Sequence, residues 1–173
     1  MTGEGEGVLL TGGLGVGKSA VAIEAHAVLS EHGVPNALLD LDHLAWASPD
    51  SRSGETIESL LLANLRALRP QFERAGVRRF LLTRAVSGSA DAEAIRAAFG
   101  LPLTVVRLTA PRAVAEARLR ARDVGAELRS NLAKLDAFAA GAGEDFELAN
   151  DGRPIRAVAL ELLDRLGWVR IAP

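Results

Sequence analysis

The chain has 173 residues, a length that suits one domain with a sizeable buried core. Its 20 basic and 22 acidic residues give a net charge of −2, so no overall field favours nucleic acid or an anionic membrane. The absence of cysteine excludes disulfides, thiolate metal sites and thiol catalysis. No apolar run approaches the roughly 18 residues of a membrane span, and residues 1–7 do not read as a signal peptide. We therefore expect a cytoplasmic protein with no membrane or nucleic-acid partner.

Apolar strands alternate with helical stretches along the chain. The strands are predicted at residues 8–11, 37–40, 79–83, 103–108 and 146–149. The helices are predicted at 19–32, in a stretch that ends before Pro70, at 90–99, after Pro111, at 127–139 and at 154–166. In two of these helices apolar residues recur at helical spacing: Ile57, Leu61, Leu65 and Leu68 in one, and Leu128, Leu132 and Leu135 in the other. The alternation predicts one α/β domain over residues 1–173, with a parallel sheet covered on both faces and a flexible segment at 1–6.

The most specific motif lies between the first strand and the first helix. Residues 12–19 match G-x-x-x-x-G-K-S/T, the pattern of a phosphate-binding loop, or P-loop. Glycines let backbone N–H groups face a polyphosphate, and the helix N-terminus adds partial positive charge. Lys18, one of only two lysines, is predicted to reach the β- and γ-phosphates, and Ser19 to bind Mg²⁺. The predicted ATP contacts are Gly12, Gly13, Leu14, Gly15, Val16, Gly17, Lys18, Ser19 and Ala20.

Two carboxylates follow the second predicted strand, where open parallel sheets bind their ligands. Asp40 and Asp42 point the same way if the extended backbone continues between them. We predict that Asp42 is the base that takes a proton from a substrate hydroxyl, and that Asp40 holds the metal. Both are expected to contact the substrate. The alternative is a turn or helix cap, a common role of aspartate, and His43 beside them is more often structural.

Two further side chains are candidates for the substrate site. Trp46 either forms a wall of the pocket or anchors its loop on the core. Arg84 follows the third strand, where many P-loop enzymes carry a metal-orienting aspartate, so the metal is left to Asp40 or to water-mediated contacts. Arg84 itself either clamps an anionic acceptor or phosphate, or is a surface arginine.

Later in the chain, two arginines share one helical face. Arg118 and Arg122 are four residues apart, so one is able to stack on a base while the other meets phosphate. Arg122 is predicted to stabilise charge on a transferring phosphoryl group. The alternative is a solvated face with Glu116 and Asp123 as partners. After the fifth strand, a tight loop is predicted either to border adenine or to be only a turn: Asn150, Gly152, Arg153 and Pro154.

In their order along the chain, these motifs resemble the small P-loop kinases: nucleoside monophosphate kinases, shikimate kinase, adenylylsulfate kinase, gluconate kinase and chloramphenicol phosphotransferase. The resemblance implies a three-layer P-loop NTPase fold with sheet order 2-3-1-4-5 and a short lid at about residues 118–129, hinged at Gly125. It also implies ATP on residues 12–19, with Arg118 on the adenine side and Arg122 on the phosphate side.

At two positions the sequence departs from the motifs of named family members, so neither of their substrates is supported for this chain. The glycine triplet of shikimate kinase reads Thr83-Arg84-Ala85 here, and the Gly-Asp-Asn of adenylylsulfate kinases reads Leu41-Asp42-His43. The resemblance therefore implies a kinase that moves the γ-phosphoryl group of ATP, with Mg²⁺, to a hydroxyl of a small molecule. The alternatives are a regulatory ATPase or switch and a polynucleotide-end kinase. The segment between the second and third strands carries the leucine-rich helix and few polar groups, which favours a less charged acceptor. The sequence identifies neither the acceptor nor the oligomeric state.

Overall fold

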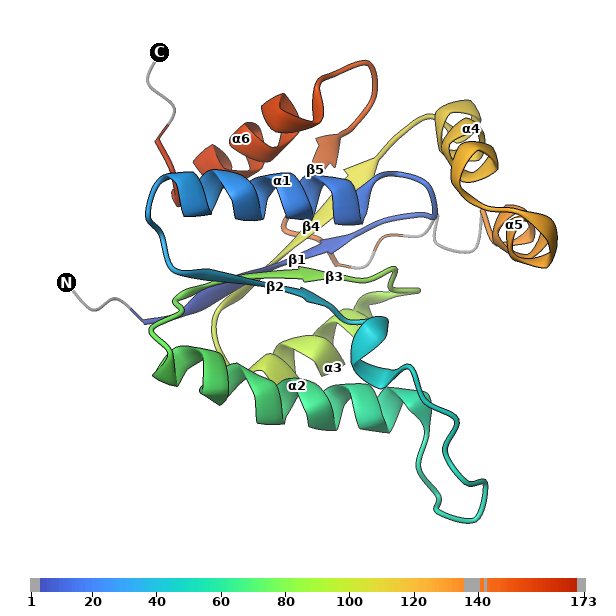
Figure 1. The fold of residues 1–173 in the computed structure, drawn as a ribbon, viewed down its shortest axis with the longest axis horizontal. Helices are drawn as coiled ribbons and strands as arrows, with labels where there is room; N and C mark the ends of the chain where they lie inside the picture. The colour runs from blue at the N-terminus through green and yellow to red at the C-terminus, as the bar shows by residue number, and fades with distance from the viewer. Residues whose placement is uncertain (1–3, 136–140, 142, 171–173) are drawn as a thin grey trace.

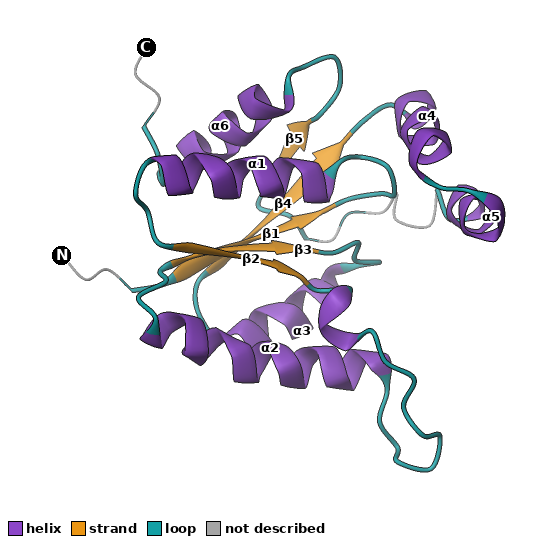
Figure 2. Cartoon of the chain, viewed as in Figure 1, coloured by secondary structure: helices purple, strands orange, loops and turns teal. Residues whose placement is uncertain are grey.

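The computed structural model describes residues 4–135, 141 and 143–170. Five parallel strands form one sheet in the order β2-β3-β1-β4-β5, which confirms the predicted P-loop NTPase topology (Figure 2). The strands are β1 (Glu6–Thr11), β2 (Asn36–Asp40), β3 (Arg79–Thr83), β4 (Leu103–Thr109) and β5 (Phe146–Ala149). Since all five run the same way, their carboxyl ends meet at one edge of the sheet.

Helices cover both faces of this sheet (Figure 1). On one face lie α1 (Lys18–Glu31) and α6 (Ile155–Arg165), and on the other α2 (Ile57–Arg74) and α3 (Ser89–Phe99). Three helices lie toward the carboxyl ends of the strands: the 3-10 helix η1 (His43–Ala45), α4 (Arg112–Arg122) and α5 (Gly125–Ala133). Of the helices in the described ranges, none is long and apolar enough to cross a membrane.

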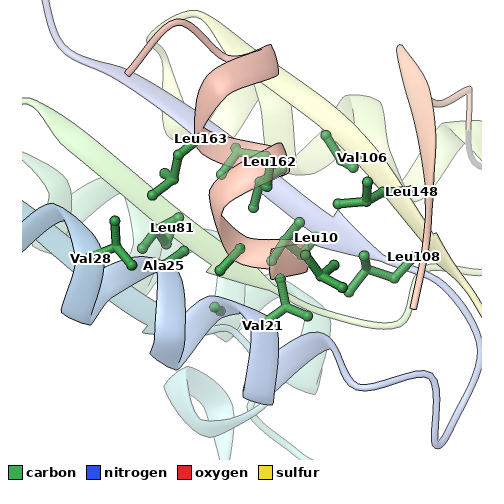
Figure 3. Close-up of a cluster of buried hydrophobic side chains, with 14 of the residues drawn as sticks. Leu10, Val21, Ala25, Val28, Leu81, Val106, Leu108, Leu148, Leu162 and Leu163 are labelled. Carbon is green, nitrogen blue, oxygen red and sulfur yellow. The ribbon is translucent and has the colours of Figure 1, made fainter. Parts of the chain in front are cut away.

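The sheet separates two apolar cores. Successive residues of a strand point to opposite faces, so Leu10 packs with Val21 of α1 and Leu162 of α6 (Figure 3), while Leu9 packs on the α2–α3 side. Both faces of a central strand such as β1 are therefore buried, which explains its unbroken apolar run. Each large apolar side chain buried in this way contributes about 1.5–3 kcal/mol. The cores thus hold the strand ends, and the site built on them, in fixed positions.

The start of the first strand and the end of the second helix differ between the sequence prediction and the structure. β1 already begins at Glu6, inside the segment expected to be flexible, and Glu6 lies 3.2 Å from the guanidinium of Arg79. The predicted end of the second helix before Pro70 is wrong, because α2 continues to Arg74. Proline removes one N–H donor from the helix, but Phe72 beyond it packs edge-on against Phe80 of the sheet, with ring centroids 6.4 Å apart. This contact offsets part of the cost of the missing hydrogen bond.

The helix predicted at 127–139 begins two residues earlier and is shorter in the structure. α4 ends at Arg122, the backbone is extended at Val124, and α5 runs from Gly125 to Ala133, with no fully buried residue. Residues 136–139 of the prediction lie outside the described part of the chain. The segment predicted to be a lid thus covers the end of α4, the break and the first half of α5.

Candidate active site

The P-loop leads into α1 and is packed too closely for side chains at three of its glycines, Gly12, Gly15 and Gly17; at Gly15, φ is +75° and a Cβ atom would lie 2.4 Å from the carbonyl oxygen of Ala115 in α4. Gly12 has φ +125° and Gly17 has φ +98°, which are conformations that only glycine adopts easily. A Cβ atom on Gly12 would lie 2.3 Å from the carbonyl oxygen of Leu108, and one on Gly17 would lie 2.4 Å from the side-chain nitrogen of Asn150. The loop is therefore held in its conformation by β4 on one side and by the loop after β5 on another.

The ammonium group of Lys18 is folded into this loop. Its Nζ donates to the carbonyl oxygens of Gly12 and Gly13, at 3.0 and 2.9 Å. Burial lowers the pKa of Lys18 to about 8; the positive charge of Arg122 acts in the same direction, while Asp42 and Asp40 oppose it. Three other predicted site residues therefore act electrostatically on Lys18: Asp40 at the end of β2, Asp42 just after it, and Arg122 of α4.

The free protein is expected to become more stable as the pH rises from about 8 to about 10.5, the ordinary pKa of an unfolded lysine. Between these values the unfolded chain keeps the Lys18 proton that the folded chain has lost, so the free energy of unfolding rises by up to about 1.4 kcal/mol per pH unit. The chain has no tyrosine or cysteine and only one other lysine, so few other groups titrate in this window. Urea unfolding at several pH values measures the rise; Lys18→Ala should lack it, and an equal rise in that variant would contradict the assignment.

Asn150 and Arg118 fasten the P-loop from behind. The side-chain amide of Asn150 donates to the carbonyl oxygen of Val16 at 2.7 Å, and Arg118 donates to the same oxygen at 3.2 Å and to the Asn150 carbonyl oxygen at 3.0 Å. Asn150 is fully buried. Both residues were predicted to contact the nucleotide; the structure gives them a direct role in positioning the loop, and their contact with ATP stays a prediction.

Asn150→Ala is expected to lower the free energy of unfolding by about 1–3 kcal/mol, because it removes a buried donor to Val16. For a chain of this size, the melting temperature should fall by about 2–4 °C per kcal/mol. Asn64→Ala is the matched control, since its exposed amide also donates to a backbone carbonyl, that of Leu44, and water is able to replace it. Equal melting temperatures for the two variants would show that Asn150 does not fasten the loop.

The rest of the loop after β5 has structural partners. Pro154 caps α6, Arg153 forms an ion pair with Glu161 at 2.6 Å, and Gly152 is exposed with φ +63°. The turn expected as an alternative is therefore present, and the predicted contacts of these residues with adenine stay predictions.

Asp40 ends β2, and Asp42 lies in the short turn that follows, at the edge of the sheet where the P-loop follows β1. An Oδ1 atom of Asp40 accepts a hydrogen bond from the backbone N–H of Asp42 at 3.1 Å, and Oδ2 lies 3.8 Å from Nδ1 of His43. Desolvation raises the pKa of Asp42, Arg84 opposes this, and the negative charge of Asp40 adds to it. The Asp42 side chain is nevertheless 65% exposed, so its carboxylate is open to a ligand.

Arg84 is held by an acid that the sequence did not single out. Its guanidinium donates to both carboxylate oxygens of Glu58, at 3.1 and 2.6 Å, and its Nε lies 3.6 Å from Asp42. Glu58 lies in the first turn of α2, which brings it to this edge. The only sequence signal for it was an acid at a helix start, which usually complements the helix dipole. Arg84 is therefore a half-buried link between α2 and the end of β2, and the simple surface arginine expected as an alternative is excluded.

Trp46 lies on the surface and does not anchor the loop. Its side chain is 85% exposed and stacks on His43, with ring centroids 5.5 Å apart. Leu41 and Ala45, both buried, hold the loop on the core instead. Of the two predictions for Trp46, the core anchor is wrong, and a wall of the substrate site stays a prediction.

Arg122 is paired at the break between α4 and α5. It donates to both carboxylate oxygens of Asp123, at 2.5 and 3.1 Å, and Asn131 of α5 donates to Asp123 as well. These hydrogen bonds lower the pKa of Asp123, that from Arg122 most strongly. The pairing of Arg122 with Asp123, which was expected as the alternative, is therefore present. The Arg122 side chain is still 63% exposed, and its charge acts on Lys18.

Thr83 is a residue that the sequence analysis missed. It ends β3, in register with Leu10 of β1 and Asp40 of β2, where a metal-orienting acid was sought. It is 2% exposed, and its hydroxyl has no hydrogen-bond partner among the described residues. Strand alternation places it on the same face as Leu81, beneath α1. A buried hydroxyl without a partner is rare and fits a site that a ligand completes.

The protein oxygens suit a magnesium ion that is held mainly by phosphates. Within the described ranges, no group of three or more His, Cys, Asp or Glu side chains is able to bind a metal. Mg²⁺ with a nucleotide commonly uses one or two protein ligands, with phosphates and waters for the rest. Ser19, exposed at the first turn of α1, and Asp40, 31% exposed at the end of β2, fit that arrangement.

Comparison with known proteins rests on structure alone, since no family model and no curated protein matches the sequence. The tunicamycin resistance protein of Deinococcus radiodurans is 18% identical, with 98% of this chain and 100% of that chain covered and a TM-score of 0.67. The APS kinase of Mycobacterium tuberculosis, in complex with AMPPNP and APS, is 22% identical, with 95% of this chain and 98% of that chain covered and a TM-score of 0.64. A gluconokinase from Sinorhizobium meliloti is 19% identical over 93% of each chain, with a TM-score of 0.56. The chain therefore has the fold of the small P-loop kinases.

Proposed function

We propose that this protein is an ATP-dependent kinase that transfers the γ-phosphoryl group to a hydroxyl of a small molecule. The observation that carries the proposal is a shared edge of the sheet: the P-loop follows β1, with Lys18 Nζ bonded to the Gly12 and Gly13 carbonyl oxygens, and the exposed carboxylate of Asp42 follows β2, two strands away. Similar folds in proteins named as kinases support it, including an APS kinase solved with AMPPNP. An ATP-binding loop beside an accessible base is the minimum that phosphoryl transfer to an alcohol requires.

Each residue has a role in this proposal. The N–H groups of the P-loop and Lys18 hold the β- and γ-phosphates, and Ser19 and Asp40 hold Mg²⁺, which neutralises charge on those phosphates. Asp42 orients the acceptor hydroxyl and accepts its proton, and its raised pKa suits a base better than an ordinary aspartate does. Arg122 leaves Asp123 for the phosphates as residues 118–129 close like a lid and exclude water.

The structure gives little support to the two alternative functions, a regulatory ATPase or switch and a polynucleotide-end kinase. A switch or regulatory ATPase needs no exposed carboxylate beside the P-loop. A polynucleotide kinase needs an open basic surface, but three arginines of one region of the sequence are engaged: Arg79 with Glu6, Arg84 with Glu58, and Arg78 with the backbone carbonyls of Glu73 and Val77. A small acceptor therefore fits best.

Thermal unfolding with Mg-ATP, Mg-GTP and Mg²⁺ alone tests nucleotide binding first. A ligand at a hundred times its dissociation constant adds about 2.7 kcal/mol, which raises the melting temperature by roughly 5–10 °C for a chain of this length. We expect this rise with Mg-ATP. A rise selective for Mg-GTP would favour a switch, and no rise with either nucleotide would refute the kinase assignment.

A further inference from the structure

The segment that borders the acceptor side of the P-loop is strongly acidic. Residues 40–58 contain five acidic residues but a single arginine. That arginine, Arg52, is paired with Asp50 at 2.8 Å. Asp40, Asp42 and Glu58 lie at the edge of the candidate site, in contact with His43 or Arg84. The acceptor therefore enters a negatively charged part of the surface.

The cations around Asp42 are already engaged. Arg84 and Lys18 are the arginine and the lysine whose charges act on its carboxylate. Lys18 belongs to the phosphate side, and Arg84 is only 18% exposed, with both ends of its guanidinium bound to Glu58. An arginine that recognises an anionic substrate must offer this two-pronged edge to the ligand. Here Glu58 occupies it, so a negatively charged acceptor would meet carboxylates instead of a free guanidinium.

Trp46 adds a large aromatic face next to these carboxylates. It is 85% exposed and stacks on His43, which in turn lies 3.8 Å from Asp40. An aromatic face attracts a cation through its quadrupole, and nearby carboxylates strengthen that attraction. The same face is able to pack against a flat ring. Trp46 belongs to neither core, so its exposed face is open to a ligand.

We propose that the acceptor is a cationic hydroxyl compound, an amine-bearing sugar or polyol ring that stacks on Trp46 with its ammonium group near Glu58, whose side chain is 43% exposed. The inference rests on the proposed kinase function, because it concerns the acceptor of the same site. In the transfer step, the acceptor oxygen bonds to the γ-phosphorus of ATP while the bond from that phosphorus to the β–γ bridging oxygen breaks. The hydroxyl proton goes to Asp42, and ADP leaves.

The charge at the site is measurable without knowing the acceptor, because Trp46 is an exposed fluorophore. The other tryptophan, Trp168, is 8% exposed, and Trp46→Phe gives its contribution alone. Quenching by caesium and by iodide at constant ionic strength, each relative to free N-acetyltryptophanamide, reports the local potential. We expect caesium to be favoured over iodide about sevenfold or more, because a potential of about one kT or more raises the local caesium concentration and lowers that of iodide by the same factor. A preference for iodide would overturn the proposal.

The source of that potential is tested with one charge-removing variant and a matched control. Glu58→Gln should reduce the caesium preference, because it removes a carboxylate and leaves Arg84 uncompensated. Glu93→Gln makes the same change in another Arg–Glu pair, that with Arg96 on α3, and should leave the preference unchanged. Equal effects of the two variants would show that Glu58 does not set the charge at this site.

Acceptor selection is then measured by ADP release with three compounds of one carbon skeleton: glucosamine, glucose and gluconate. We expect kcat/KM at pH 7 for glucosamine to exceed that for gluconate by at least about tenfold, a difference of about 1.4 kcal/mol, and Glu58→Gln to narrow this ratio. Preference for gluconate would overturn the proposal. If no compound stimulates ADP release and no nucleotide stabilises the protein, the kinase assignment fails; the quenching ratio still decides the charge of the site.

Discussion

Lys18→Ala is expected to bind Mg-ATP roughly 10 to 150 times more weakly than the unchanged protein. The substitution removes a charge-assisted contact with the β- and γ-phosphates, which contributes about 1.5–3 kcal/mol. Turnover should fall further, because the same ammonium group stabilises charge on the transferring phosphoryl group. Isothermal titration with Mg-ATP measures the affinity. Without nucleotide, the melting temperature at pH 7 should not fall, since burial disfavours the charged form of this lysine.

Lys134→Ala is the matched control, because Lys134 is the other lysine of the chain and is exposed at the end of α5. It should bind Mg-ATP as the unchanged protein does. Unchanged affinity in Lys18→Ala would contradict the P-loop assignment. A large loss of stability without nucleotide would instead indicate that Lys18 mainly supports the fold.

Asp42→Asn is expected to lower kcat for phosphoryl transfer by about 10²- to 10⁴-fold, the usual contribution of a general base. Asparagine keeps the size of the side chain but cannot accept the hydroxyl proton. The affinity for Mg-ATP should stay within about twofold, because the proposed role of Asp42 is at the acceptor and not at the phosphates. ADP release with a saturating acceptor gives kcat, and titration gives the affinity.

Asp50→Asn supplies the comparison for this variant. Asp50 is an exposed carboxylate of the same acidic segment, but its partner is Arg52 and not a group of the P-loop. It should change kcat by less than about twofold. If Asp42→Asn lost nucleotide binding but kept measurable transfer, Asp40 would be the base and Asp42 the residue on the metal side.

The sheet and the P-loop were predictable because their signals are local. Apolar runs of strand length, separated by helical stretches, predict a parallel sheet, and the P-loop motif fixes which strand and helix flank the phosphate site. The order of the strands came from the resemblance to small P-loop kinases, and the structure confirms it. The helical end before Pro70 was wrong because the packing of Phe72 on Phe80 involves residues on different elements.

Much of the candidate site depended on such distant contacts and was not predictable. The pairing of Arg84 with Glu58 joins residues 26 positions apart, and the hydrogen bond from Asn150 to Val16 spans 134 positions. No local pattern announces either one. The exposure of Trp46 also depends on how its loop leaves the core. Thr83 was missed because a polar residue at the end of an apolar strand ordinarily marks only the end of the strand.

The most direct test of the kinase proposal is phosphorus NMR of the protein with Mg-ATP and an amine-bearing sugar. The account predicts that ADP and a new phosphate-monoester signal of the sugar grow at equal rates, and that both are lost in Asp42→Asn. ADP growing together with inorganic phosphate, and no monoester, would show an ATPase and contradict the account.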